Sequence, residues 1–236
     1  MTKTMTVLIG NYGSGKTEIA VNMALREAGN GLRTLVIDLD KVNDYFRMSD
    51  RLSLLEEKNI NLVSPTFAGK GATPSSMSAA VASAFTDEWD RVIFDVGGDA
   101  AGALSLGRYY QDFAAQPQGS VEVLDIVNVF RPMSESAEKI MKLKGDMESF
   151  ARLAVTGYVN NSNLLTWASA DDLRRGYDVV RELSDMTGLP VAMTTGRKNC
   201  LEEFLSDGRD ARYIGSTLAL EPYMHRSWES FTTQGF

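Results

Sequence analysis

The chain has 236 residues, of which 44% are hydrophobic, and it carries a formal net charge of −7. This is enough apolar material to bury a core, and open α/β sheets of this length commonly form one domain. The acidic balance argues against non-specific binding to nucleic acid, which requires a basic surface. The single cysteine, Cys200, excludes a disulfide within the chain and a cysteine-ligated zinc or iron–sulfur site within one copy.

The chain begins with a short apolar run, residues 5–9, that leads directly into a glycine-rich loop. This run is too short for a signal peptide, and no stretch of about 18 apolar residues follows anywhere. We therefore expect no transmembrane segment and a cytoplasmic location.

Apolar runs alternate with helical patterns along the whole chain. The runs are rich in β-branched residues and apolar on both faces, as is typical of strands buried between two layers of helices. They predict strands at residues 5–9, 34–38, 60–63, 91–96, 121–130, 153–159 and 189–193. Helical patterns cover residues 16–29, 75–86, 101–115, 134–150, 169–187 and 200–206. This alternation predicts one α/β domain over residues 1–236, with a mainly parallel sheet, helices on both faces and a C-terminal extension, 196–236, packed on it.

The sequence GNYGSGKT follows the first predicted strand and fits the phosphate-loop pattern of Gly, four residues, Gly, Lys and Ser or Thr. A chance match would occur in roughly one chain in a hundred of this length. Glycines let backbone N–H groups curl around an anion, and the helix that begins there adds partial positive charge. Lys16 can reach the β- and γ-phosphates, and the Thr17 hydroxyl can hold Mg²⁺. The expected nucleotide-binding residues are Gly10, Asn11, Tyr12, Gly13, Ser14, Gly15, Lys16, Thr17 and Glu18.

Aspartates follow two other predicted strands. Asp95 ends one strand and precedes Gly97 and Gly98, while Asp38 and Asp40 follow the strand at 34–38. Carboxylates near a triphosphate repel it unless Mg²⁺ intervenes, so these positions suit the handling of metal and water. Gly97 or Gly98 would let the loop respond to the γ-phosphate. The alternative is that these aspartates form turns and helix caps, which are common after strands.

These motifs resemble the MinD/ParA group of P-loop ATPases, the SIMIBI class, over about residues 5–195. The likeness is greatest to uncharacterised MinD-like ATP-binding proteins, and it implies a P-loop NTPase domain that uses ATP and Mg²⁺. It also implies that Lys16 and Asp40 are catalytic, with Asp40 orienting the attacking water. Thr17, Asp38 and Asp95 would form the magnesium shell. The segment VTGYVNNSNL resembles the strand whose following Asn contacts adenine, here Asn161.

One loop position departs from the family pattern. Members that dimerise around ATP carry a second lysine there, which reaches the partner's phosphates, whereas this chain has Asn11. An asparagine brings no charge, so neutralisation in trans is missing from its usual place. Neither Lys41 nor Arg131 is expected to replace it singly. The sequence therefore does not decide whether two copies dimerise around ATP. Intrinsic hydrolysis of ATP is expected to be slow.

The base and the overall role rest on weaker signals. The segment NNSN, residues 160–163, lacks the lysine and the final acid of a guanine-binding motif, which favours ATP over GTP. We expect a slow, Mg²⁺-dependent ATPase that acts as a switch or chaperone for a protein partner through loops 39–50 and 97–105. One alternative is an ATP-dependent synthetase, amidoligase or kinase-like enzyme. Such an enzyme needs basic groups that face the γ-phosphate, and Arg131, Arg197 and Lys198 form no recognisable set of this kind. Another alternative is a nucleotide-binding module that has lost hydrolysis.

Overall fold

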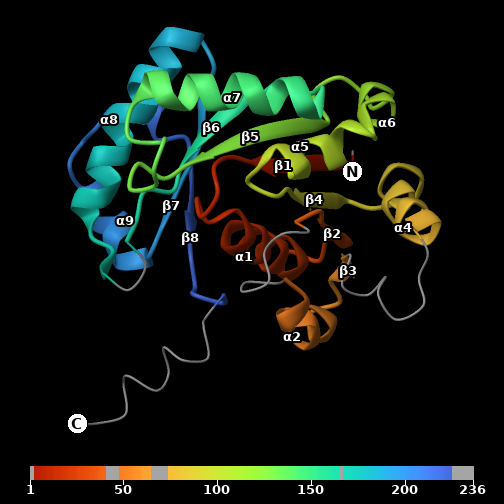
Figure 1. Ribbon diagram of the computed structural model, residues 1–236. Coiled ribbons are helices and arrows are strands. Elements are labelled where there is room, and N and C mark those ends of the chain that lie inside the picture. The colour runs from red at the N-terminus through yellow and green to blue at the C-terminus, as the bar shows by residue number, and fades with distance from the viewer. Residues whose placement is uncertain (1–2, 41–47, 65–73, 165–166, 225–236) are drawn as a thin grey trace, which may run out of the picture.

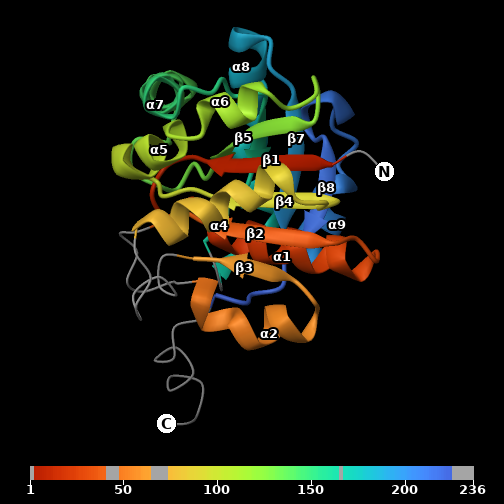
Figure 2. The same ribbon diagram turned by 90° about the vertical axis from the view of Figure 1, so that its right-hand side faces the viewer.

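The chain is represented by a computed structural model, which describes residues 3–40, 48–64, 74–164 and 167–224, without the side chains of 49–50 and 74–78. The described residues form one sheet of eight parallel strands in the order β3-β2-β4-β1-β5-β6-β7-β8. The strands are β1 (Thr4–Ile9), β2 (Thr34–Asp38), β3 (Asn61–Val63), β4 (Arg91–Asp95), β5 (Val121–Val127), β6 (Gly157–Asn160), β7 (Val191–Gly196) and β8 (Ser216–Ala219). Figure 2 shows β1 lying between β5 and β4, with β2 and β3 beyond β4.

Helices cover both faces of this sheet (Figure 1). The helices are α1 (Lys16–Gly29), α2 (Leu52–Glu57), α4 (Pro74–Thr86), α5 (Ala100–Gly107), α6 (Tyr110–Ala114), α7 (Ala137–Ala151), α8 (Ala170–Thr187) and α9 (Lys198–Leu205), with short 3-10 turns at Met48–Arg51 and Ala211–Tyr213. Side chains of α1 and α2 share one buried apolar cluster with the sheet. Those of α4, α5, α6 and α7 share a second cluster on the opposite face, where α8 also packs. Burial on both sides explains why the strand sequences are almost continuously apolar.

The predicted α/β fold with helices on both faces is confirmed, and most predicted elements lie within a few residues of the observed ones. The predicted helix at 101–115 is divided into α5 and α6. The division falls at Gly107, where a Cβ would overlap the carbonyl oxygen of Phe150 on α7. Strand β8 and helix α2 have no counterpart among the predicted elements. Each has only four to six residues, too few for a periodic pattern to stand out.

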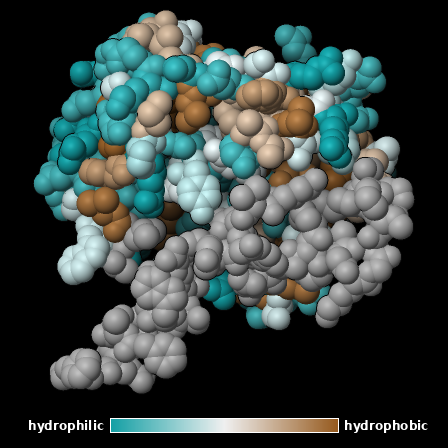
Figure 3. Space-filling model, in the orientation of Figure 1, coloured by the Kyte–Doolittle hydropathy of each residue, from teal (hydrophilic) through white to brown (hydrophobic). Residues whose placement is uncertain are grey.

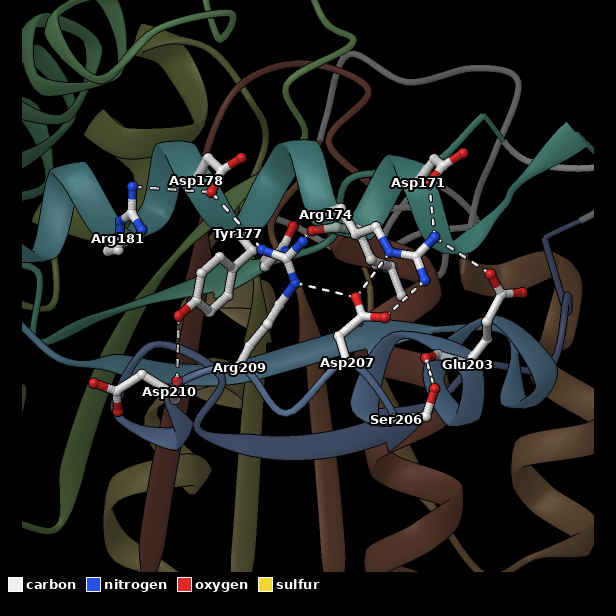
Figure 4. A network of polar contacts seen from close by, with 12 residues as sticks. Asp171, Arg174, Tyr177, Asp178, Arg181, Glu203, Ser206, Asp207, Arg209 and Asp210 are labelled. Atoms are coloured by element: carbon white, nitrogen blue, oxygen red, sulfur yellow. Dashed lines mark hydrogen bonds and ion pairs between the residues drawn. The ribbon is translucent and has the colours of Figure 1, made fainter.

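The surface along the first two thirds of α8 carries a network of charged side chains (Figure 4). Arg174 binds Asp207 with its Nε at 2.8 Å and Asp171 with its Nη1 at 2.7 Å. Arg209 also lies within 3.2 Å of Asp207. Asp171 and Glu203 are exposed, whereas the side chains of Arg174 and Asp207 are 26% and 24% exposed, and the network links α8 to the segment after α9.

The last described residues, 221–224, lie against the start of α1. The Glu18 carboxylate accepts hydrogen bonds from the backbone N–H groups of Tyr223 at 2.8 Å and Met224 at 3.0 Å. Asn22, one turn later, donates to the Glu221 carbonyl at 3.0 Å and accepts from its N–H at 2.8 Å. We call residues 221–224 the C-terminal strap. It covers the apolar cluster beneath α1 with Tyr223 and Met224.

Candidate functional site

The phosphate-loop sequence lies where the strand order reverses. Strand β1 has β4 on one side and β5 on the other, and the loop leaves the C-terminal end of β1 between them. Ligands of open α/β sheets bind at this kind of position. Gly10, Gly13 and Gly15 have φ angles of 134°, 71° and 93°, in the region that favours glycine. A Cβ at Gly10 would also lie 2.6 Å from the carbonyl oxygen of Ile126 on β5, so the loop requires glycine there.

The Lys16 ammonium is held inside the loop. Its Nζ donates to the carbonyl oxygens of Gly10 at 3.1 Å and Asn11 at 2.9 Å, and the residue is only 6% exposed. Burial lowers the pKa of Lys16, and the carboxylates of Asp95 and Asp40 act in the opposite direction. The buried Ser14 hydroxyl has no hydrogen-bond partner among the described residues. A buried cation and an unsatisfied donor at a helix start suit the binding of an anion.

Asp38 and Asp95 are register partners on β2 and β4, so their carboxylates lie side by side. Asp95 is 1% exposed, and neither of its oxygens has a hydrogen bond of acceptable geometry among the described residues. Burial and the neighbouring Asp38 carboxylate raise the pKa of Asp95 to about 7, partly offset by the Thr17 hydroxyl and Lys16. A buried carboxylate that lacks well-formed hydrogen bonds calls for a bound cation or water. The three predicted magnesium ligands are thus brought together, and their oxygen donors fit Mg²⁺.

Asp40 and the glycines after β4 lie next to one another. A Cβ on Gly97 would lie 3.4 Å from Oδ1 of Asp40, and one on Gly98 would lie 2.6 Å from the backbone nitrogen of Tyr12. The loop after β4 therefore contacts both the phosphate loop and the predicted water-orienting acid. Asp38 accepts a hydrogen bond from the Asp40 N–H at 2.9 Å and one from the Ser64 hydroxyl at 3.0 Å, which fixes the turn after β2.

Asn161, predicted to contact adenine, is 2% exposed and engaged with the protein itself. Its Nδ2 donates to the Ser14 carbonyl at 2.6 Å, and its Oδ1 accepts from the Thr195 hydroxyl at 2.7 Å. The side chain thus joins the ends of β6 and β7 to the phosphate loop. Glu18 is likewise engaged, with its carboxylate on the C-terminal strap. Its backbone remains in the first turn of α1.

Sequence reasoning missed two features of this site. The loop after β5, residues 128–134, lies against the phosphate loop: Asn11 Nδ2 donates to the Pro132 carbonyl at 2.5 Å, and Arg131 Nε donates to the Gly13 carbonyl at 2.7 Å. Asp125, near the end of β5, is buried beside Gly10 and has a raised pKa of about 7 because of that burial. Asp125 stands inside an apolar strand pattern, and this interruption is the one signal that the sequence carried.

Part of the predicted switch region, residues 41–47 with Lys41, lies outside the described residues.

Within the described part of the chain, no group of three or more His, Cys, Asp or Glu side chains is arranged to hold a metal by itself. No helix in that part combines the length and apolar character needed to span a membrane. On the face seen in Figure 3, hydrophilic and hydrophobic residues are interspersed.

No protein-family model matches the sequence, and no curated protein does. Solved structures of FtsY do match the fold. Chloroplast FtsY from Physcomitrella patens aligns with a TM-score of 0.57 and 16% identity, over 82% of this chain and 58% of that chain. The cell division protein FtsY from Thermotoga maritima gives 0.52 and 19%, over 82% and 61%.

A third match holds a nucleotide. The signal recognition particle receptor FtsY from Elizabethkingia anophelis, in complex with GDP, aligns with a TM-score of 0.51 and 21% identity, over 83% of this chain and 58% of that chain. The alignments thus span about three fifths of each FtsY chain. At these identities the likeness concerns the fold: this chain shares with the FtsY structures an α/β fold built on a parallel sheet.

Proposed function

We propose that the protein binds a nucleoside triphosphate with Mg²⁺ on residues 10–17 and hydrolyses it slowly, as a SIMIBI-class switch or chaperone for a protein partner. One observation carries the proposal. The glycine curl surrounds the buried Lys16 ammonium, and neither oxygen of the neighbouring Asp95 carboxylate has a hydrogen bond of acceptable geometry among the described residues. A buried cation and a buried unsatisfied anion at one site are costly unless a ligand completes both. A magnesium–triphosphate complex carries both complementary charges.

Each side chain has a defined task in this proposal. The loop N–H groups and Lys16 bind the β- and γ-phosphates. Thr17 and Asp95 hold the metal, with Asp38 in the outer shell. Mg²⁺ would neutralise the charge that develops on the phosphates. Asp40 orients the attacking water, and its neighbours Gly97 and Gly98 carry the change of nucleotide state into α5.

We favour ATP as the nucleotide. The support is the sequence after β6, Asn160 to Asn163, which lacks the lysine and the acid that would bind a guanine edge. Guanine is the competing base, because one of the FtsY structures of this fold is a complex with GDP. Titration with fluorescent analogues of ATP and GTP decides between them. Tighter binding of the GTP analogue would overturn the choice of ATP without affecting the phosphate site.

The phosphate assignment is tested by Lys16→Ala. Loss of the ammonium held by the loop should abolish binding of ATP in isothermal titration, because the β- and γ-phosphates then lose their positive partner. Lys142→Ala, an exposed lysine on α7, is the matched control for loss of one positive charge. Undiminished affinity in Lys16→Ala would refute the site.

The catalytic role of Asp40 is tested by Asp40→Ala. This variant should bind ATP and Mg²⁺ as the wild type does but release no phosphate, because no carboxylate then orients the water. Light scattering of the same variant with ATP and Mg²⁺ reports whether a dimer forms. Normal turnover would remove Asp40 from its role, and a mass that stays monomeric would count against a homodimer built around ATP.

A further inference from the structure

The loop after β5 places a guanidinium directly on the phosphate loop. Arg131 Nε donates to the Gly13 carbonyl at 2.7 Å. A Cβ built on Gly13 would lie 3.3 Å from Nε and 3.6 Å from Cδ and Cζ. The guanidinium therefore packs against the phosphate loop at its central glycine.

Asn11 fixes the loop that carries this arginine. Its Nδ2 donates to both the Pro132 carbonyl, at 2.5 Å, and the Ser134 hydroxyl, at 2.9 Å, while its Oδ1 accepts from the Tyr12 N–H at 2.7 Å. Both amide donors of Asn11 are thus used within the chain. Asn11, at the second position of the phosphate loop, therefore links this loop to residues 132–134 through hydrogen bonds.

The site has an excess of negative charge, which a second cation would reduce. The carboxylates that act on Lys16 are those of Asp95, Asp40, Asp125 and Asp99, and the whole chain has a net charge of −7. Even together with Mg²⁺, Lys16 does not offset these carboxylates and a polyphosphate. Among the described residues, Arg131 makes no ion pair with a carboxylate, so its charge is not consumed by a neighbour. Gly13 and its contact with Arg131 are exposed to solvent, so the effect of this charge on a bound anion should weaken as the salt concentration rises.

We propose that Arg131 is a second cation of the phosphate site, supplied in cis, and that Asn11 positions it by holding the loop at 132–134. The inference rests on the proposed function, since it requires a phosphate-bearing ligand on residues 10–17. In family members that dimerise, the lysine at the second loop position brings a positive charge to the partner's phosphates. In this chain, Arg131 would bring the corresponding charge to the phosphates bound by the same copy. Arg131 is a positioning and electrostatic residue here: its Nε holds Gly13, and its charge favours the more highly charged nucleotide.

The test compares Arg131→Gln with Arg181→Gln, which removes the same charge from the exposed middle of α8. Affinities for ATP and ADP are measured by titration at low and high potassium chloride. Arg131→Gln should weaken ATP binding about tenfold, because a charge-assisted contact is lost, and should weaken ADP binding less. The difference from the wild type should shrink at high salt, since screening removes an electrostatic term. Arg181→Gln should match the wild type.

Two further variants separate charge from structure. Arg131→Lys keeps the charge and should recover part of the lost affinity, while Ser134→Ala removes one anchor of Asn11 and should weaken ATP binding in the same direction but less. Unchanged ATP affinity in Arg131→Gln, with binding lost in Lys16→Ala, would overturn this inference and leave the proposed function intact. A loss in Arg131→Gln that is equal at all salt concentrations and equal for ATP and ADP would also overturn it. Binding retained in Lys16→Ala would instead overturn the proposed function.

Discussion

Replacing Asp125 with asparagine should remove a pH-dependent loss of stability from the protein. Asp125 lies near the end of β5, 5% exposed, and its carboxylate is beside Gly10. Burial raises its pKa from 3.8 to about 7, while Lys16 and Lys144 lower it and Glu148 raises it. Asparagine has nearly the same shape but no proton to release, so the variant isolates the ionisation.

The sign and size follow from proton linkage. As the pH rises, the carboxyl of the unfolded chain, with its ordinary pKa, loses its proton before the buried one does. Between the two pKa values the native state binds more protons, so the free energy of unfolding of the wild type falls with pH. The fall is complete above the folded pKa of about 7. From pH 5 upward it spans ~2 pH units at ~1.4 kcal/mol each, or about 3 kcal/mol.

The assay is urea unfolding of wild type and Asp125→Asn at pH 5 and pH 8, without added nucleotide. The free energy of unfolding of the variant, relative to the wild type, should rise by about 3 kcal/mol between the two conditions. Other titrating groups cancel in this difference. Asp146→Asn, an exposed aspartate on α7, controls for the loss of one carboxylate. A difference that is the same at both pH values would refute the reasoning, because Asp125 would then ionise alike in both states.

Two glycine substitutions test close approaches in the fold. Gly176→Ala should lower the free energy of unfolding by about 1–3 kcal/mol in urea titrations, because a Cβ on this face of α8 would overlap the Asn160 side chain. Gly145→Ala, in α7 with nothing within 4 Å of the added Cβ, is the control and should be stabilising by about 0.5–1 kcal/mol; equal effects would contradict the contact at Gly176. Gly98→Ala should weaken ATP binding in isothermal titration, because its Cβ would lie 2.6 Å from the backbone nitrogen of Tyr12 and displace the phosphate loop. Wild-type affinity in that variant would show that the two loops can separate freely.

The sequence was sufficient for the parts of the structure that depend on local pattern. Apolar runs alternating with helical periodicity predicted the parallel sheet, because strands buried on both faces must be apolar throughout. The phosphate loop was equally predictable, since its backbone conformation demands glycine at fixed positions. That Asp38 and Asp95 share one site was implied by the family resemblance, and the register of β2 and β4 places them side by side.

What could not be predicted depends on contacts between distant segments. Asn11 meets Ser134 across 123 positions, and the Asn161 side chain reaches Ser14 across 147. Neither residue type nor spacing signals such a pair, because a side-chain amide can donate to any nearby acceptor. From the sequence, Asn11 could be interpreted only as the absence of the lysine that dimerising family members carry at this position. The structure adds that its amide connects two loops of one chain, a use that only tertiary geometry reveals.

The bonds between Glu18 and residues 223–224 have a practical bearing on how the protein is handled. Glu18 comes two positions after Lys16, so the carboxyl-terminal part of the chain is anchored to the same helical turn that would receive a nucleotide. A tag added at the carboxyl end follows a segment that is bonded to this turn, so nucleotide affinities should be measured with the tag removed.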